Sequence, residues 1–80
     1  MTRVVVYTAT GCDLCERAIE VVKDAQTELG FELELVDIAG DPGLEVRYRE
    51  HLPVVEIDGE RAFTYFVEPE SLRMRLAARR

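Results

Sequence analysis

The chain has 80 residues, enough for a single domain with a modest hydrophobic core. Its 16 acidic and 10 basic residues give a formal net charge of −6, which argues against a nucleic-acid partner because phosphates would be repelled. Apolar residues make up 48%, as in an ordinary soluble protein, and no apolar run is long enough to cross a bilayer. The first residues show no signal-peptide pattern. We therefore expect a cytoplasmic protein that binds neither nucleic acid nor membrane.

The first half of the chain predicts a strand, a helix and a second strand. Residues 3–8 form a β-branched, almost wholly apolar run, typical of a central strand covered on both faces. Apolar residues then recur at helical spacing over 13–29, and Gly30 supplies a C-terminal stop. Residues 31–38 predict the second strand. Together these elements predict a right-handed βαβ unit, in which the two strands are parallel.

The second half predicts a short helix, a β-hairpin and a last helix. Asp41 as N-cap, followed by a proline, predicts a helix that ends near His51. A third strand is predicted over 54–57, and the Asp-Gly pair at 58–59 is typical of a two-residue hairpin turn. The return strand is predicted over about 61–66. The hairpin therefore adds an antiparallel pair of strands to the sheet.

The last helix begins at residues 68–71, where acidic side chains lie at the positive end of the helix dipole. Its buried side is expected to contain Leu72 and Leu76, with Met74 and Ala77 as further candidates. The last ten residues contain no acid and four arginines: Arg73, Arg75, Arg79 and Arg80. We expect these arginines to form the solvated end of a helix stabilised by its own dipole, and a partner-docking patch is the alternative.

Both cysteines lie at the predicted junction between the first strand and the first helix. Cys12 and Cys15 are separated by two residues, and a Cys-x-x-Cys at such a junction indicates redox chemistry. Dithiol exchange needs an exposed thiolate that attacks and a nearby second thiol that resolves the mixed disulfide. Side chains three residues apart on a helix lie on the same face. We assign Cys12, at the helix start, as the nucleophile and Cys15, one turn further, as the resolving thiol.

The sequence also indicates how reactive Cys12 should be. An unperturbed thiol has a pKa near 8.5 and is only about 3% thiolate at pH 7. A helix N-terminus stabilises the thiolate by up to ~2 kcal/mol, whereas the neighbouring carboxylate of Asp13 disfavours a second negative charge. Arg17, one turn on, partly offsets that carboxylate. We therefore expect a thiol less acidic than that of oxidising relatives and a comparatively reducing disulfide.

Four short motifs follow one another along the chain: Val5-Val6-Tyr7-Thr8, then Gly11-Cys12-Asp13-Leu14-Cys15, then Leu52-Pro53-Val54-Val55, then Ile57-Asp58-Gly59-Glu60. Together with the predicted βαβαββα order, they resemble a glutaredoxin, in particular the small glutaredoxin-like proteins. The resemblance covers essentially the whole chain, 1–80. It implies an α/β, thioredoxin-like domain with a four-stranded mixed sheet and helices on both faces. It also implies a thiol–disulfide oxidoreductase that reduces disulfides of proteins or small molecules.

The resemblance further implies where a substrate binds. In thioredoxin-like proteins the proline before the third strand is cis, and the backbone of the residue before it pairs with the substrate. A cis Leu52-Pro53 bond is therefore implied, with Leu52 main-chain groups holding the substrate peptide; a trans proline at a strand start is the alternative. Gly11, Leu14 and Tyr65 are assigned as further substrate-binding residues.

The chain departs from the glutaredoxin pattern at three places. Ala9 stands where glutaredoxins commonly have a glutathione-binding lysine, the Asp-Leu pair at 13–14 replaces Pro-Tyr, and residues 64–67 replace a Gly-Gly turn. Bulky side chains at 64–67 would lie where a peptide would bind. Arg47 and Arg49 are the candidate ligands for a substrate carboxylate, as basic residues there are in relatives. Glutathione therefore stays open as co-substrate, and a thioredoxin-reductase-type enzyme is the alternative electron donor.

The expected partners are disulfide-containing proteins or glutathione mixed disulfides, together with an upstream reductase. We expect a monomer with no bound cofactor. Two thiolates supply half of a zinc site, but closure needs four ligands, and His51 is the single histidine and is expected at the surface. We therefore expect no bound metal. An iron–sulfur cluster that bridges two subunits, as in single-cysteine glutaredoxins, is an alternative that the presence of Cys15 disfavours. The other alternative is a non-catalytic binding module, with Tyr65 and Phe66 as a peptide-docking surface.

Overall fold

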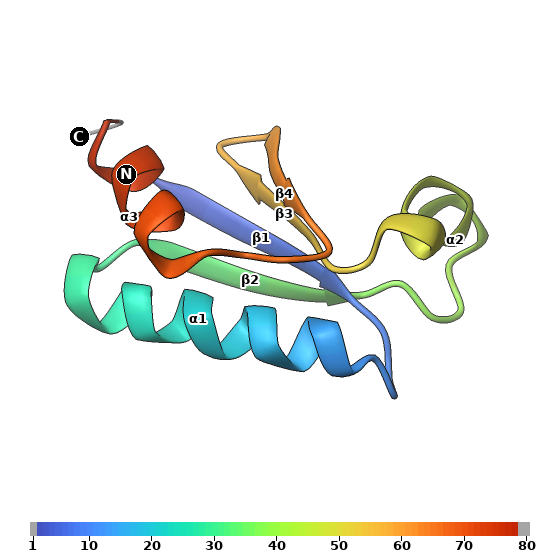
Figure 1. Ribbon diagram of the computed structural model, residues 1–80. Coiled ribbons are helices and arrows are strands. Elements are labelled where there is room, and N and C mark those ends of the chain that lie inside the picture. Colours follow the sequence, from blue (N-terminus) through green and yellow to red (C-terminus); the bar gives the residue numbers. More distant parts are fainter. Residues whose placement is uncertain (1, 79–80) are drawn as a thin grey trace.

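The structure is a computed structural model that describes residues 2–78. The helices and strands follow the predicted order (Figure 1). They are β1 (Arg3–Thr8), α1 (Asp13–Leu29), β2 (Glu32–Asp37), α2 (Pro42–Tyr48) with a following 3₁₀ turn η1 (Arg49–His51), β3 (Val54–Ile57), β4 (Glu60–Thr64) and α3 (Pro69–Ala77).

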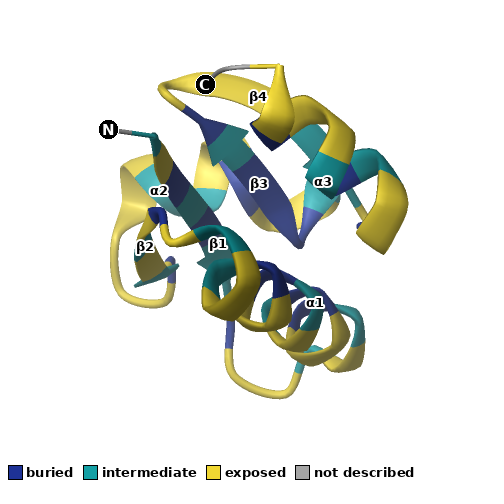
Figure 2. Ribbon diagram, turned by 90° about the vertical axis from the view of Figure 1, so that its left-hand side faces the viewer, coloured by how far each residue is buried: buried dark blue, intermediate teal, exposed yellow. Residues whose placement is uncertain are grey.

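The four strands form one mixed sheet in the order β2-β1-β3-β4. β1 and β2 are parallel, and β3 is antiparallel to both β1 and β4. The predicted parallel pair and hairpin are therefore confirmed. Figure 2 shows buried residues concentrated in β1 and β3, the two central strands, whereas the outer strands are more exposed.

The main hydrophobic core lies between one face of the sheet and the helices α1 and α3. Alternate residues of β1 and β3 point to this face, including Val4, Val6 and Val55, which have no exposed surface. α1 contributes Val22 and its neighbouring alanines, and α3 contributes leucines, among them Leu72. Each fully buried valine or leucine contributes about 1.5–3 kcal/mol relative to an exposed one. This packing fixes α1, and therefore its first turn, against the sheet.

The opposite face of the sheet is covered by α2 at the end where β1 stops. Tyr48 of α2 is buried and stacks on Tyr7 of β1, with ring centroids 4.1 Å apart. The two tyrosine hydroxyls donate hydrogen bonds to the carboxylate of Glu56, at 3.0 Å from Tyr48 and 3.5 Å from Tyr7. Burial raises the pKa of Tyr7 to about 12, and the negative charge of Glu56 acts in the same direction. Arg47 and Arg61 lie over the Tyr48 ring.

Local sequence signals set most element ends. Gly30 ends α1 in the left-handed region at φ 69°, and its N–H donates to the Gln26 carbonyl at 2.8 Å. The Asp41 carboxylate caps α2 by accepting hydrogen bonds from two backbone N–H groups at 3.1 and 3.2 Å. The hairpin turn has positive φ at both central residues, 50° at Asp58 and 86° at Gly59. The end of α1, the start of α2 and the hairpin turn were all predicted from the sequence.

Two predictions about the second half are wrong. The return strand ends at Thr64 rather than Phe66, because Tyr65 adopts a left-handed backbone at φ 66° that interrupts the strand. In α3, Leu72 and Leu76 are buried as predicted, but Met74 is 72% exposed and Ala77 is also exposed. Residues two apart on a helix point in nearly opposite directions, so Met74 cannot share the face of Leu72.

The arginines of α3 make contacts with neighbouring elements. Arg73 forms an ion pair with Glu28 at the end of α1, with N–O distances of 2.9 and 3.1 Å. Arg75 lies over the Phe63 ring, 5.2 Å from its centroid. Arg79 and Arg80, the other two arginines of the predicted solvated helix end, lie outside the described residues. Over residues 2–78, no helix combines the length and apolar character needed to cross a membrane.

Candidate active site

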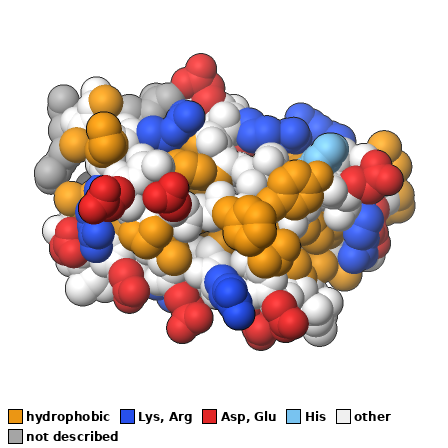
Figure 3. All heavy atoms as spheres, in the orientation of Figure 1, with side chains coloured by type: hydrophobic (Ala, Val, Ile, Leu, Met, Phe, Trp, Pro, Cys, Tyr) orange, Lys and Arg blue, Asp and Glu red, His pale blue; other side chains and the backbone are white. Residues whose placement is uncertain are grey.

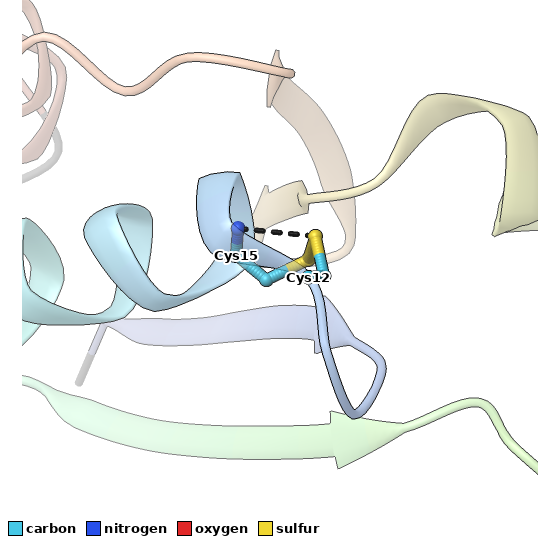
Figure 4. Close-up of a disulfide and its surroundings, with 2 residues drawn as sticks. All are labelled: Cys12 and Cys15. Carbon is cyan, nitrogen blue, oxygen red and sulfur yellow. Dashed lines mark hydrogen bonds between the residues drawn. A yellow bond between two sulfur atoms is a disulfide. The ribbon is translucent and has the colours of Figure 1, made fainter.

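Cys12 and Cys15 are joined by a disulfide at the start of α1 (Figure 4). Their Cα atoms are 5.2 Å apart. Cys12 is the N-cap residue of the helix, and its Sγ accepts a hydrogen bond from the Cys15 N–H at 3.2 Å. A backbone N–H group without a helical partner therefore points at the Cys12 sulfur, which favours negative charge on that sulfur.

A tight turn brings Cys12 from the end of β1 to the helix start. Gly11 adopts φ 81°, a conformation that residues with a side chain rarely adopt. The Cys12 N–H donates to the Ala9 carbonyl at 3.3 Å, and the Cys12 carbonyl accepts from the Glu16 N–H at 3.1 Å. Gly11 thus shapes the turn that presents Cys12.

The two cysteines differ in accessibility. Cys12 is half-buried, whereas Cys15 has no exposed surface. Cys15 belongs to a buried cluster with Ala9 and Leu52, and Cys12 packs at the edge of that cluster. Cys12 is therefore the more accessible of the two cysteines.

The predicted cis peptide bond between Leu52 and Pro53 is confirmed. Both residues are buried, and Leu52 shares the hydrophobic cluster of Cys15. β3 begins directly after them, and Val54 pairs with Tyr7 near the end of β1. The cis-proline segment therefore lies at the same end of the sheet as the cysteine turn.

Tyr65 connects the cis-proline segment to the segment between β4 and α3. Its backbone N–H donates to the Pro53 carbonyl at 3.0 Å. Its hydroxyl donates to the Glu50 carbonyl at 2.9 Å, and His51 Nδ1 lies 3.2 Å from the same oxygen. Because the hydroxyl hydrogen is directed at Glu50, the imidazole is left to donate from Nδ1 to Tyr65. The sequence pattern placed Tyr65 near the site but gave no signal for these hydrogen bonds.

A groove of about 240 Å³ separates the first turns of α1 from the segment that follows Tyr65. Leu14, one of the two residues between the cysteines, lies at one wall, and Tyr65 and Phe66 lie at the other. The remaining lining residues are Arg17, Ala18, Val21, Val67, Glu68 and Pro69. Of the residues predicted to bind substrate, the structure thus brings Leu14 and Tyr65 together in one groove. Gly11, Leu52 and Pro53 shape the cysteine and cis-proline segments.

The two candidate carboxylate ligands already have contacts. Arg49 forms an ion pair with Glu45 one turn earlier. Arg47 lies over the Tyr48 ring, 5.3 Å from its centroid. Their binding of a substrate carboxylate stays a prediction. Within residues 2–78, no group of three or more histidine, cysteine or acidic side chains is arranged to hold a metal ion.

A family described as "Glutaredoxin-like domain (DUF836)" matches residues 3–77 of this chain, with the disulfide, the cis-proline and the sheet all inside the match. The chain belongs to this family. Similar sequences include the uncharacterized proteins Rv0508 of Mycobacterium tuberculosis and Mb0520 of Mycobacterium bovis. Each is 32% identical to this chain, and the match covers 94% of this chain and 82% of the relative.

Solved structures confirm the thioredoxin-like fold of this glutaredoxin-like protein. The structural genomics target XcR50 from X. campestris is 29% identical, with a TM-score of 0.77 over 94% of this chain and 96% of that chain. Ne2328 from Nitrosomonas europaea is also 29% identical, with a TM-score of 0.77 over 92% and 89%. Thioredoxin-2 of a malaria parasite shares the fold at 18% identity, with a TM-score of 0.77 over 98% and 82%.

Proposed function

We propose that this glutaredoxin-like protein is a thiol–disulfide oxidoreductase that reduces disulfides with Cys12 as nucleophile and Cys15 as resolving thiol. The observation that carries this proposal is the asymmetry of the pair. A half-buried sulfur at a helix N-cap is paired with a sulfur that has no exposed surface. Dithiol exchange needs this division between an attacking and a resolving thiol.

The reaction takes two steps. In the reduced protein, the Cys12 thiolate attacks one sulfur of the substrate disulfide, which forms a Cys12–substrate mixed disulfide and releases the other substrate sulfur as a thiolate that takes up a proton. Cys15 then loses its proton and attacks the Cys12 sulfur. This forms the Cys12–Cys15 disulfide and releases the second substrate thiol. The substrate gains two electrons, and the protein loses two.

The geometry supports particular roles for the surrounding groups. The Cys15 N–H that points at the Cys12 sulfur stabilises the attacking thiolate of the first step. The cis-proline segment, with the Leu52 backbone, is proposed to pair with the substrate chain, as the resemblance to thioredoxin-like proteins implies. Return to the dithiol requires an external thiol reductant, either glutathione or a reductase of the thioredoxin-reductase type.

Two coupled assays test the proposal. The protein is supplied either with glutathione, glutathione reductase and NADPH, or with thioredoxin reductase and NADPH, and the reduction of a disulfide substrate is followed by NADPH consumption. Turnover in one assay, lost in Cys12→Ser, is the expected result and identifies the electron donor. No turnover in either assay, together with a Cys12 that resists alkylation after reduction, would show that the protein is not an oxidoreductase.

The second candidate function is a binding module without catalysis. The observation in its favour is the exposed aromatic side chain of Phe66, which is 72% exposed beside an apolar groove. Such a module would bind its partner equally well when both cysteines are replaced by serine. A redox enzyme would lose its covalent intermediate with the substrate in the same variant.

A further inference from the structure

The segment between β4 and α3 presents hydrophobic side chains to solvent opposite the first turns of α1. Tyr65 is 42% exposed and Phe66 is 72% exposed. Figure 3 shows hydrophobic side chains gathered on the face where this segment passes α1. A cluster of exposed hydrophobic side chains on a small protein marks a surface that another molecule covers.

The backbone of this segment is held in a conformation that exposes Phe66. Tyr65 has φ 66°, which is unfavourable for a residue with a side chain and persists only where surrounding contacts enforce it. Its N–H bond to the Pro53 carbonyl and its hydroxyl bond to the Glu50 carbonyl supply that constraint. The left-handed residue ends β4 and turns the chain, and Phe66 follows at the edge of the groove.

The groove reaches the segment of α1 that contains the disulfide. Leu14 lies in its wall, two residues from Cys12 and directly before Cys15. Its volume of about 240 Å³ is below the roughly 300–1,000 Å³ of pockets that enclose a whole drug-sized ligand. A space of this size suits an apolar side chain next to the bond being reduced.

The charges of the groove favour a polypeptide over a small anion. Its lining contains one cation, Arg17, and one anion, Glu68, and is otherwise apolar or aromatic. The whole chain has a formal net charge of −6. Glutathione, with two carboxylates and one ammonium group, is a net anion, and a groove with balanced charges in an acidic protein offers it no net attraction.

We propose that this groove, between Leu14 on α1 and Phe66 before α3, selects protein disulfides whose cysteine is adjacent to an apolar side chain. Phe66 is the residue that determines this specificity, and Tyr65 is a positioning residue that holds Phe66 at the groove edge. The inference rests on the proposed oxidoreductase function and adds the substrate class: an extended polypeptide segment with an apolar residue beside its disulfide. No further chemistry is needed beyond the two exchange steps at Cys12 and Cys15.

Two synthetic peptides test the inference. Each is uncharged at its flanking residues and has one intramolecular disulfide; one has leucine and the other has serine next to the cysteine that Cys12 attacks. The full chain is reduced with dithiothreitol, freed of it, and mixed with each peptide, and the formation of the Cys12–Cys15 disulfide is measured by acid quench and mass spectrometry. We expect the wild-type protein to react about tenfold faster with the leucine peptide, because part of that side chain leaves water in the complex.

Three variants assign this preference to Phe66. In Phe66→Ala, the ratio of the two rate constants should fall to about two, whereas Phe66→Leu should keep most of the preference. Met74→Ala is the matched control, since Met74 has the same exposed fraction of 72% on α3 and does not line the groove. Its ratio should equal that of the wild type. Thermal unfolding of each variant checks that the fold is intact.

The outcomes separate the inference from the proposed function. If the reduced wild-type protein forms no Cys12–Cys15 disulfide with either peptide or with hydroxyethyl disulfide, the oxidoreductase proposal is wrong, and the inference that rests on it is wrong as well. If it reduces both peptides at equal rates, the function stands and the groove inference is overturned. Sedimentation that shows a wild-type dimer and a monomeric Phe66→Ala protein would also overturn it, since a second copy of this chain would then cover the groove.

Discussion

The cysteine end of α1 and the segment between β4 and α3 form opposite walls of one groove, but they are built in different ways. At the cysteine end, the chemistry comes from the backbone: a glycine turn, a helix N-cap and an N–H directed at the Cys12 sulfur. At the other wall, the surface comes from the side chains of Tyr65 and Phe66, held by contacts with residues distant in sequence. In the function proposed above, the first wall supplies the reaction and the second selects the substrate.

The largest effect is expected at the cysteine wall. In Cys15→Ser, Cys12 can still attack a disulfide, but no second thiol is available to release the product. The mixed disulfide between Cys12 and the substrate should therefore persist at least ~100-fold longer than in the wild-type protein. Mass spectrometry of the quenched reaction measures this adduct. Cys12→Ser is the control and should form none; a stable adduct on Cys15 in that variant would reverse the assigned roles.

A smaller effect is expected at the opposite wall. Tyr65→Phe removes the hydroxyl that donates to the Glu50 carbonyl and accepts from His51. The loss should lower the free energy of unfolding by about 1 kcal/mol, the usual net contribution of such a hydrogen bond. Urea unfolding monitored by circular dichroism gives the value.

The comparison variant for Tyr65→Phe is Val46→Ala, at a side chain that is 88% exposed on α2. Its free energy of unfolding should change by less than about 0.5 kcal/mol. If Tyr65→Phe also changes the free energy of unfolding by less than this, the hydroxyl bond to Glu50 does not stabilise this segment. The left-handed backbone at Tyr65 must then be enforced by other contacts.

The smallest effect concerns charge beside the nucleophile. Asp13 is exposed in the first turn of α1, next to Cys12, and its carboxylate opposes a negative charge on that sulfur. In the reduced protein, Asp13→Asn should raise the rate of Cys12 alkylation by iodoacetamide at pH 7 about two- to threefold, with a smaller gain at high salt. Asp24→Asn, further along the same helix, should leave the rate unchanged. A slower reaction in Asp13→Asn would contradict the electrostatic reasoning.

The features that local sequence determines were predictable. Gly30 and Asp41 end and begin helices through their own conformation or side chain, so a few residues suffice to place these ends. The Cys-x-x-Cys spacing at the strand–helix junction likewise located the disulfide at the start of α1. The cis Leu52-Pro53 bond was predicted from the resemblance to thioredoxin-like proteins, since an X-Pro bond alone favours trans.

The opposite wall was less predictable because tertiary contacts decide its structure. The return strand was predicted to run to about Phe66, and aromatic residues do favour strands. The hydroxyl bond to Glu50, 15 residues earlier, instead holds Tyr65 in the left-handed region. The ion pair of Arg49 with Glu45 and the contact of Arg47 with Tyr48 were also not predicted, since several partners were within reach in sequence.

The most direct test of the account is the order in which the two thiols react. The reduced protein is treated at pH 7 with less than one equivalent of iodoacetamide, and peptide mapping then locates the label. Because Cys12 is half-buried at the helix N-cap and Cys15 has no exposed surface, the label should be found on Cys12 and be nearly absent from Cys15. Labelling of Cys15 first, or of both cysteines equally, would contradict Cys12 as the attacking thiol.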